Sequence, residues 1–230
     1  MKTGFGGAIF TIIGSLFLQS VCAHPLTALE KRIDDNPYDS DFVLNLANVS
    51  ATDNGLGAKI QGGAVDQFHA LDGLRISNSM FTLDACGMNL PHIHPRATEE
   101  IYVMAGTNLT CGFSEENGGR TIMNTISQGW NAVFPMGLPH FQINNSCEEV
   151  RFLSSLSHED PGVITLPDRI LGFPDNVLQT AFNIGHYGNG TDQFKAKIDM
   201  REIQKKCLQT CKHSTPPHNS TAYNTTTTWH

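Results

Sequence analysis

The chain has no excess of positive charge. Its 230 residues include 15 Lys and Arg against 22 Asp and Glu, which gives a formal net charge of −7. Proteins that bind nucleic acids usually present a basic face, and the few basic residues here do not cluster in that way. The composition therefore argues against DNA or RNA as a partner.

Long apolar runs are also scarce. The one extended run, from Ala8 to Leu18, is interrupted by Gly14 and is too short to cross a bilayer core of roughly 30 Å. It follows Lys2 and is followed by the small residues that end at Ala23, which is the pattern of a secretory signal peptide. We therefore expect a signal peptide over residues 1–23, no membrane span and a secreted, extracellular or cell-wall protein; a membrane anchor is the less favoured alternative.

A second processing step is indicated by the dibasic pair Lys31-Arg32. Cleavage there would define residues 24–32 as a propeptide and make Ile33 the first residue of the mature chain. The alternative is that the pair is simply two solvated charges in a flexible leader. Six Asn-X-Ser/Thr patterns fit a secreted glycoprotein: Asn48, Asn108, Asn144, Asn189, Asn219 and Asn224.

The rest of the chain divides into three parts by composition. Residues 33–57 are polar and are expected to form an extended arm. Residues 58–206 are expected to form one domain, in which short apolar stretches alternate with turn residues as far as Ser157, as in an all-β sandwich or barrel, and two or three short helices follow. Residues 207–230 are rich in Ser, Thr and Pro and are expected to form a disordered tail.

Histidine is concentrated in the stretch "GMNLPHIHPRATEEIYVMAG". On a strand, His92 and His94 point to the same face because side chains alternate. Pro95 ends that strand, and we expect Glu99 to begin a returning strand that brings its carboxylate to the imidazoles across a hairpin. A second stretch, "GWNAVFPMGLPHFQIN", contains His140, which a closed barrel could bring to the same point.

These four residues would form a site with three nitrogen ligands and one oxygen ligand. A single inward histidine is usually a hydrogen-bonded core residue, but burying two histidines with a carboxylate is costly without a shared cation. A divalent metal ion is therefore the favoured interpretation. The ligand set suits manganese or iron but would also hold zinc, nickel or copper, so the residues do not choose the metal.

The two stretches resemble the two motifs of the cupins. "HPRATE" together with "HFQIN" is similar to the germin and germin-like group, which includes the spherulins. The resemblance implies a jelly-roll barrel, manganese(II) held by His92, His94, Glu99 and His140, and assembly into dimers or hexamers through the helices.

The resemblance also implies where a substrate would be held. Germins with oxalate oxidase activity use two asparagines near the metal, and Asn89 matches the nearer one, which makes it the candidate catalytic residue. Asn89 could equally be a turn residue before Pro91. The farther asparagine falls on Ser79, with Asn78 beside it, and a one-residue slip would turn Asn78 to the other face.

Three classes of function follow. The first is a manganese-dependent oxidoreductase acting on a small anion, either superoxide or oxalate. The second is a non-catalytic wall or spore-coat protein of the spherulin type, in which the metal is structural. The third is a small-ligand binding module.

The cysteines predict two disulfides, since removal of the leader leaves five. We expect Cys111 to pair with Cys147, because each follows one of the motifs that the metal draws together. A pair between Cys207 and Cys211 would require a frayed helix, and the partner of Cys86 is left open.

Overall fold

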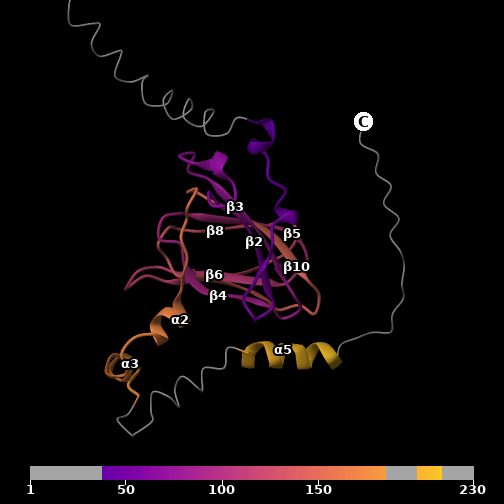
Figure 1. Ribbon diagram of the computed structural model, residues 1–230. Coiled ribbons are helices and arrows are strands. Elements are labelled where there is room, and N and C mark those ends of the chain that lie inside the picture. Colours follow the sequence, from indigo (N-terminus) through magenta and orange to yellow (C-terminus); the bar gives the residue numbers. More distant parts are fainter. Residues whose placement is uncertain (1–37, 185–200, 214–230) are drawn as a thin grey trace, which may run out of the picture.

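The computed structural model describes residues 38–184 and 201–213. Two antiparallel β-sheets lie face to face and enclose one core, and helices follow the barrel in the chain (Figure 1). This confirms the predicted all-β jelly-roll barrel with short C-terminal helices. In the described ranges no helix has both the length and the apolar character needed to cross a membrane.

The first sheet has six strands in the order β1-β2-β3-β10-β5-β8. Their bounds are β1 Thr52–Asp53, β2 Ala58–Gly63, β3 Ser77–Leu83, β10 Val150–Leu156, β5 Glu99–Ala105 and β8 Asn131–Phe134. The second sheet has five strands in the order β11-β4-β9-β6-β7. Their bounds are β11 Ile164–Thr165, β4 Met88–Ile93, β9 His140–Asn144, β6 Leu109–Ser114 and β7 Thr121–Ile126.

The core forms between the two sheets because alternate residues of each strand point inward. On β5, Ile101 and Val103 are fully buried, whereas Tyr102 between them is 45% exposed. Phe81 of β3 stacks on Phe152 of β10 with 4.8 Å between ring centroids. Glu99, which begins β5, is buried on the same inward face as Ile101 and Val103.

The arm is more structured than expected. It contains two 3-10 turns, η1 (Asp39–Phe42) and η2 (Leu46–Asn48), and then strand β1, which pairs with β2. Gln61 holds the arm against the barrel by donating hydrogen bonds to the carbonyls of Ala47 and Val49. Two 3-10 turns and one short strand thus lie within the segment 33–57, for which an extended arm is predicted.

In the described ranges three helices follow β11: α2 (Leu166–Leu171), α3 (Asp175–Phe182) and α5 (Arg201–His213). A further 3-10 turn, η3 (His69–Leu71), lies between β2 and β3. The predicted start of the tail at residue 207 falls inside α5, because the amphipathic pattern continues through the two cysteines of this helix. The predicted signal peptide, propeptide and the end of the tail lie outside the described residues.

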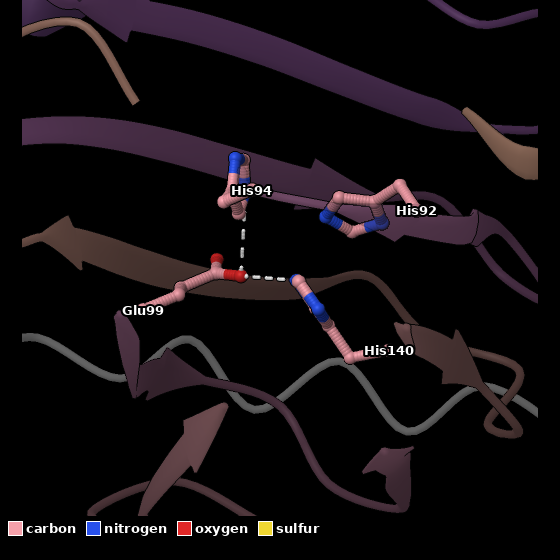
Figure 2. Close-up of side chains that lie close together, drawn as sticks. All are labelled: His92, His94, Glu99 and His140. Atoms are coloured by element: carbon pink, nitrogen blue, oxygen red, sulfur yellow. Dashed lines mark hydrogen bonds and ion pairs between the residues drawn. The ribbon is translucent and has the colours of Figure 1, made fainter. Parts of the chain in front are cut away.

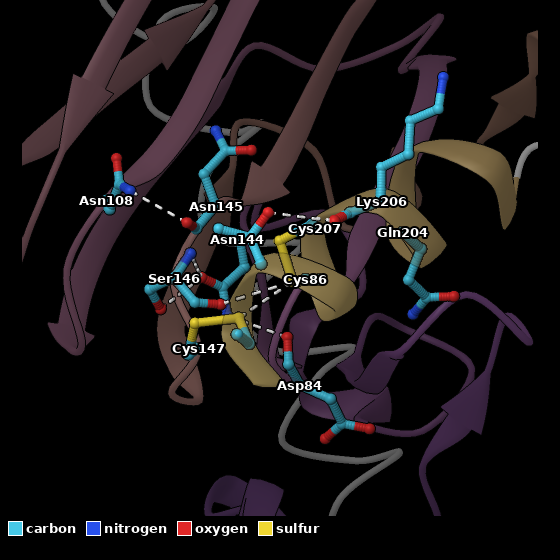
Figure 3. Close-up of a disulfide and its surroundings, with 12 residues drawn as sticks. Asp84, Cys86, Asn108, Asn144, Asn145, Ser146, Cys147, Gln204, Lys206 and Cys207 are labelled. Atoms are coloured by element: carbon cyan, nitrogen blue, oxygen red, sulfur yellow. Dashed lines mark hydrogen bonds between the residues drawn. A yellow bond between two sulfur atoms is a disulfide. The ribbon is translucent and has the colours of Figure 1, made fainter. Parts of the chain in front are cut away.

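Two disulfides join α5 to the barrel. Cys86 pairs with Cys207 (Figure 3), and Cys147 pairs with Cys211. The predicted pairs Cys111–Cys147 and Cys207–Cys211 are therefore wrong. Cys207 and Cys211 lie one turn apart on α5, so each can meet a different loop of the barrel.

Cys111 is unpaired because it points into the core. It lies on β6 opposite Gln142 of β9 and is 1% exposed, whereas Cys147 lies five residues beyond Gln142, in the loop after the strand. Burial raises the pKa of the Cys111 thiol to about 11, and the nearby charge of Glu99 adds to this effect. The thiol is consequently kept protonated.

Non-reducing peptide mapping should recover the pairs Cys86–Cys207 and Cys147–Cys211, with Cys111 alkylated only after unfolding. The sample must be kept in acid, because the Cys111 thiolate that forms on unfolding at neutral pH could attack a disulfide and displace one of its cysteines as a thiolate, which starts exchange. The Sγ atoms of Cys86 and Cys211, from the two different disulfides, lie only 3.7 Å apart. Replacing Cys147 and Cys211 together by Ser should lower the free energy of unfolding by about 2–4 kcal/mol. A recovered peptide that contains Cys111 in a disulfide would contradict this arrangement.

Asn144 is placed inward, as the alternation along β9 predicts. Its side chain is fully buried, and its Nδ2 donates to the carbonyls of Leu83, Asp84 and Glu148. These bonds tie β9 to the ends of β3 and β10. The nitrogen that would carry a glycan is thus occupied and shielded.

We predict that Asn144 is not glycosylated even though it begins an Asn-Asn-Ser pattern. Glycopeptide analysis of the folded protein should find the site empty, while Asn48, which is exposed at the end of η2, is open to modification. Substantial occupancy at Asn144 would mean that its strand is not formed as described.

Candidate metal centre

The four residues singled out in the sequence lie together inside the barrel (Figure 2). Their candidate ligand atoms all lie within 4.8 Å of one another, and all four side chains are buried. His92 is on β4 and His94 follows directly after it, while Glu99 begins β5 and His140 begins β9. His94 is the most exposed of the four, at 9%.

The expected hairpin between the histidine strand and the glutamate strand is wrong. β4 pairs with β9 and β11 in one sheet, whereas β5 pairs with β8 and β10 in the other. The turn at Pro95 therefore carries the chain from one sheet to the other, and Glu99 meets the histidines across the interior of the sandwich. The physical reason is that facing side chains of two packed sheets interdigitate, whereas neighbours on one sheet lie side by side.

His92 and His140 are held by strand register. Their Cα atoms are direct partners in the β4–β9 pair, and their ring centroids lie 4.2 Å apart. An irregularity in the pairing between Asn89 and His92 accommodates Pro91 and re-aims the end of the strand. Phe134 stacks on the His140 ring with 4.8 Å between centroids and closes one side of the site.

The three imidazoles present the same nitrogen to the centre. Each Nδ1 lies at hydrogen-bond distance from a backbone carbonyl: 2.7 Å from Leu90 for His92, 2.6 Å from Gly162 for His94, and 2.8 Å from Leu138 for His140. A carbonyl oxygen can only accept, so each Nδ1 carries the hydrogen. In the neutral rings this leaves the lone pair on Nε2, which is the arrangement of metal-ligating histidines.

Glu99 supplies the negative charge. It is fully buried, and its Oε2 lies 2.8 Å from Nε2 of His140 and 3.6 Å from Nε2 of His94. Its other oxygen, Oε1, accepts a 2.6 Å hydrogen bond from Ser154. Burial alone would raise the pKa of Glu99, but the hydrogen bonds and positive charge of His140 and His94 outweigh it and lower the pKa well below its usual range.

The pKa values of two of the histidines are shifted in opposite directions. Burial lowers the pKa of His92 to about 4, and the neighbouring His140 adds to the effect. Burial would also lower the pKa of His94, but the hydrogen bond and charge of Glu99 raise it above its ordinary value. His92 is therefore a neutral donor at physiological pH.

A divalent cation fits this donor set. Three Nε2 lone pairs and one carboxylate oxygen converge in a dry interior, where an ionised carboxylate without a partner would be strongly unfavourable. The ion would take the place of the 2.8 Å contact between Nε2 of His140 and Oε2 of Glu99. The site thus has the chemistry of a three-histidine, one-glutamate metal centre.

Asn89 and Gln142 lie beside this centre. The Nδ2 of Asn89 donates a 2.8 Å hydrogen bond to the Oε1 of Gln142, which stands two residues after His140 on the inward face of β9. Gln142 is fully buried, and its Nε2 has no partner among the described residues. The sequence analysis assigned no role to Gln142, although the alternation from His140 places it inward.

Ser79 and Asn78 take opposite faces of β3. Ser79 shares the inward face with Phe81 and Leu83, whereas Asn78 accepts a 2.9 Å hydrogen bond from Ser155 of β10 on the outer face. The structure thus places the hydroxyl, and not the neighbouring amide, on the side of the metal centre.

Comparison with known proteins agrees with this architecture. Residues 44–187 match the model of the cupin family. Spherulin-1A of Physarum polycephalum is 33% identical over 182 residues, which cover 77% of this chain and 72% of the relative. A probable germin-like protein, subfamily 2 member 5, of Arabidopsis thaliana is 33% identical over 197 residues, covering 82% and 89% of the two chains.

Among solved structures, an oxalate oxidase superposes with a TM-score of 0.65 and 26% identity, covering 73% of this chain and 85% of that one. The chain therefore belongs to the cupin family and, within it, to the group of the germin-like proteins and spherulins. The family match begins at residue 44, so part of the predicted arm belongs to the cupin domain.

The opposed pKa shifts predict how the stability of the metal-free protein depends on pH. His92 has a lowered pKa, so its contribution is complete above pH 6.5 and is lost as the pH falls toward about 4. His94 has a raised pKa, so its contribution to the free energy of unfolding is already complete below the pKa that it has in the unfolded chain. Between about pH 6.5 and 4.5, the fall in the free energy of unfolding should therefore belong to His92 and approach about 3 kcal/mol.

Urea unfolding of the metal-free protein across this pH range measures the effect. His92→Gln should flatten the profile, whereas His69→Gln, at an exposed position on η3, should leave it unchanged. An equal slope in wild type and His92→Gln would contradict the assignment.

Proposed function

We propose that the protein is a secreted, manganese-binding germin-like cupin that acts as an oxidoreductase on a small anion, superoxide or oxalate. The observation that supports this most strongly is the convergence of three Nε2 atoms and one carboxylate oxygen inside the barrel. The two disulfides fit an oxidising compartment, as expected for a secreted protein.

His92, His94, Glu99 and His140 would hold the ion. Three neutral imidazoles and one carboxylate leave a divalent ion with a net charge of about +1, so the site favours anions. When bound, manganese supplies one-electron redox chemistry. The low-dielectric interior strengthens the attraction for a small anion and excludes bulk water.

Asn89 would act with Gln142 in holding the substrate. Asn89 donates one of its two amide hydrogens to Oε1 of Gln142, which turns the buried, unpartnered Nε2 of Gln142 into an available donor. An oxygen atom of a bound anion would satisfy this buried donor. We assign Asn89 the role of fixing the Gln142 amide and, through it, the anion.

The choice between the two substrates follows from Ser79. Solved oxalate oxidases include a complex with glycolate at 27% identity to this chain, so a small carboxylate is a reasonable candidate. However, Ser79 offers one hydroxyl where oxalate-oxidising germins have an amide. We therefore favour superoxide over oxalate.

A non-catalytic coat protein is the second candidate, and the similarity to Spherulin-1A favours it. In that case the ion would be structural. A binding module is the third, since a rhicadhesin receptor of Pisum sativum is 37% identical over 155 residues, covering 65% of this chain and 70% of the receptor. In each case we propose a homo-oligomer, either a dimer or a hexamer, assembled through the helices.

The proposal is tested by elemental analysis of the secreted protein, with superoxide-dismutation and oxalate-dependent peroxide assays on the same sample. We expect about one manganese per chain and dismutation activity. His140→Ala should lose most of the metal and the activity, while His69→Ala should keep both. Manganese without either activity would support the coat-protein alternative, and wild-type protein without a bound transition metal would refute the metal centre.

A further inference from the structure

The two oxygens of Glu99 are used differently. Oε2 faces His140 and His94, at 2.8 and 3.6 Å from their Nε2 atoms. Oε1 accepts the 2.6 Å hydrogen bond of Ser154. One oxygen is therefore available to an ion, and the other is already engaged.

Ser154 occupies a position where an apolar residue would be expected. It lies on the inward face of β10 between Phe152 and Leu156, both buried, and is itself 1% exposed. Its Cα partners are Ile101 on β5 and Ser79 on β3. A hydroxyl buried in such surroundings is unfavourable unless it is hydrogen-bonded, and in the described residues its bond is to Glu99.

A short hydrogen bond to a buried carboxylate is strong enough to control its orientation. An O–H donor to an ionised oxygen gives distances of about 2.5–2.7 Å and roughly twice the strength of a neutral hydrogen bond. Because Glu99 begins β5 and Ser154 lies on the central strand of the same sheet, both ends of the bond are fixed by the sheet. The carboxylate cannot rotate without breaking it.

We propose that Ser154 is a positioning residue that keeps Glu99 a one-oxygen ligand and thereby preserves two open coordination positions. This inference rests on the proposed metal function. A carboxylate can bind an ion through one oxygen or two. With about six positions in all, four protein ligand atoms leave two for exogenous ligands, whereas a two-oxygen Glu99 leaves one.

The experiment compares variants that differ in the hydroxyl alone. Ser154→Thr keeps the hydroxyl, and Ser154→Val has nearly the same shape without it; Ser154→Ala removes it without added bulk. Ser155→Ala is the matched control, because Ser155 is the next residue but bonds to Asn78 on the outer face. Circular dichroism of each metal-free variant establishes that the barrel is intact.

Binding of Co²⁺ is measured from its visible spectrum, and binding of Mn²⁺ from its electron paramagnetic resonance spectrum. Azide, a small anion, is then added to the metal-loaded protein. We expect Ser154→Ala and Ser154→Val to bind both ions about 10-fold more weakly, because supporting hydrogen bonds typically contribute 10–100-fold to metal affinity. The spectra of the bound ions should change in these two variants. Azide should bind to the loaded variants more weakly than to loaded wild type, by a larger factor than the ions. Ser154→Thr and Ser155→Ala should resemble wild type.

Unchanged ion and azide affinities in Ser154→Ala would overturn the proposal, as would equal losses in Ser154→Thr and Ser154→Val. If Co²⁺ and Mn²⁺ bind as predicted but wild type lacks dismutation and oxalate activity, the proposed oxidoreductase fails while the role of Ser154 stands. Wild-type protein that binds neither ion would refute both.

Discussion

The buried carboxylate of Glu99 is the constraint on which the rest of the centre depends. A negative charge with no exposed surface is tolerated only when its surroundings supply positive charge and hydrogen bonds. His140 and His94 face one oxygen, and Ser154 satisfies the other. Each of these groups is in turn fixed by backbone: the imidazoles by carbonyls at their Nδ1 atoms, and the serine by its place in β10.

This constraint also explains the architecture around the site. The histidines come from one sheet and the glutamate from the other, so the centre forms only when both sheets close over the core. The disulfides act at a different place, where they hold α5 against the loops that contain Cys86 and Cys147. Metal and disulfides would thus stabilise separate parts of one fold.

Local patterns in the sequence predicted the all-β fold and the convergence of the four residues. The shared face of His92 and His94 follows from the alternation of side chains along one strand, which is a property of a short segment. The helix α3 was likewise indicated by apolar residues at helical spacing.

What could not be predicted depends on contacts between distant segments. A turn at Pro95 looks the same whether the chain forms a hairpin or crosses to the facing sheet. The disulfides depend on α5 folding back over 121 and 64 residues, and Ser154 acquires its role 55 residues away from Glu99. Gln142 was visible as an inward residue, but its unpartnered amide appears only once its neighbours are known.

The central claim is most directly tested by a crystal structure of the protein grown with Mn²⁺, with anomalous diffraction recorded at the manganese edge. The account predicts one strong peak inside the barrel, at about 2.0–2.3 Å from Nε2 of His92, His94 and His140 and from a single oxygen of Glu99. The Nδ1 atoms should still face Leu90, Gly162 and Leu138. A barrel without a peak, in which His140 still bonds to Glu99, would contradict it.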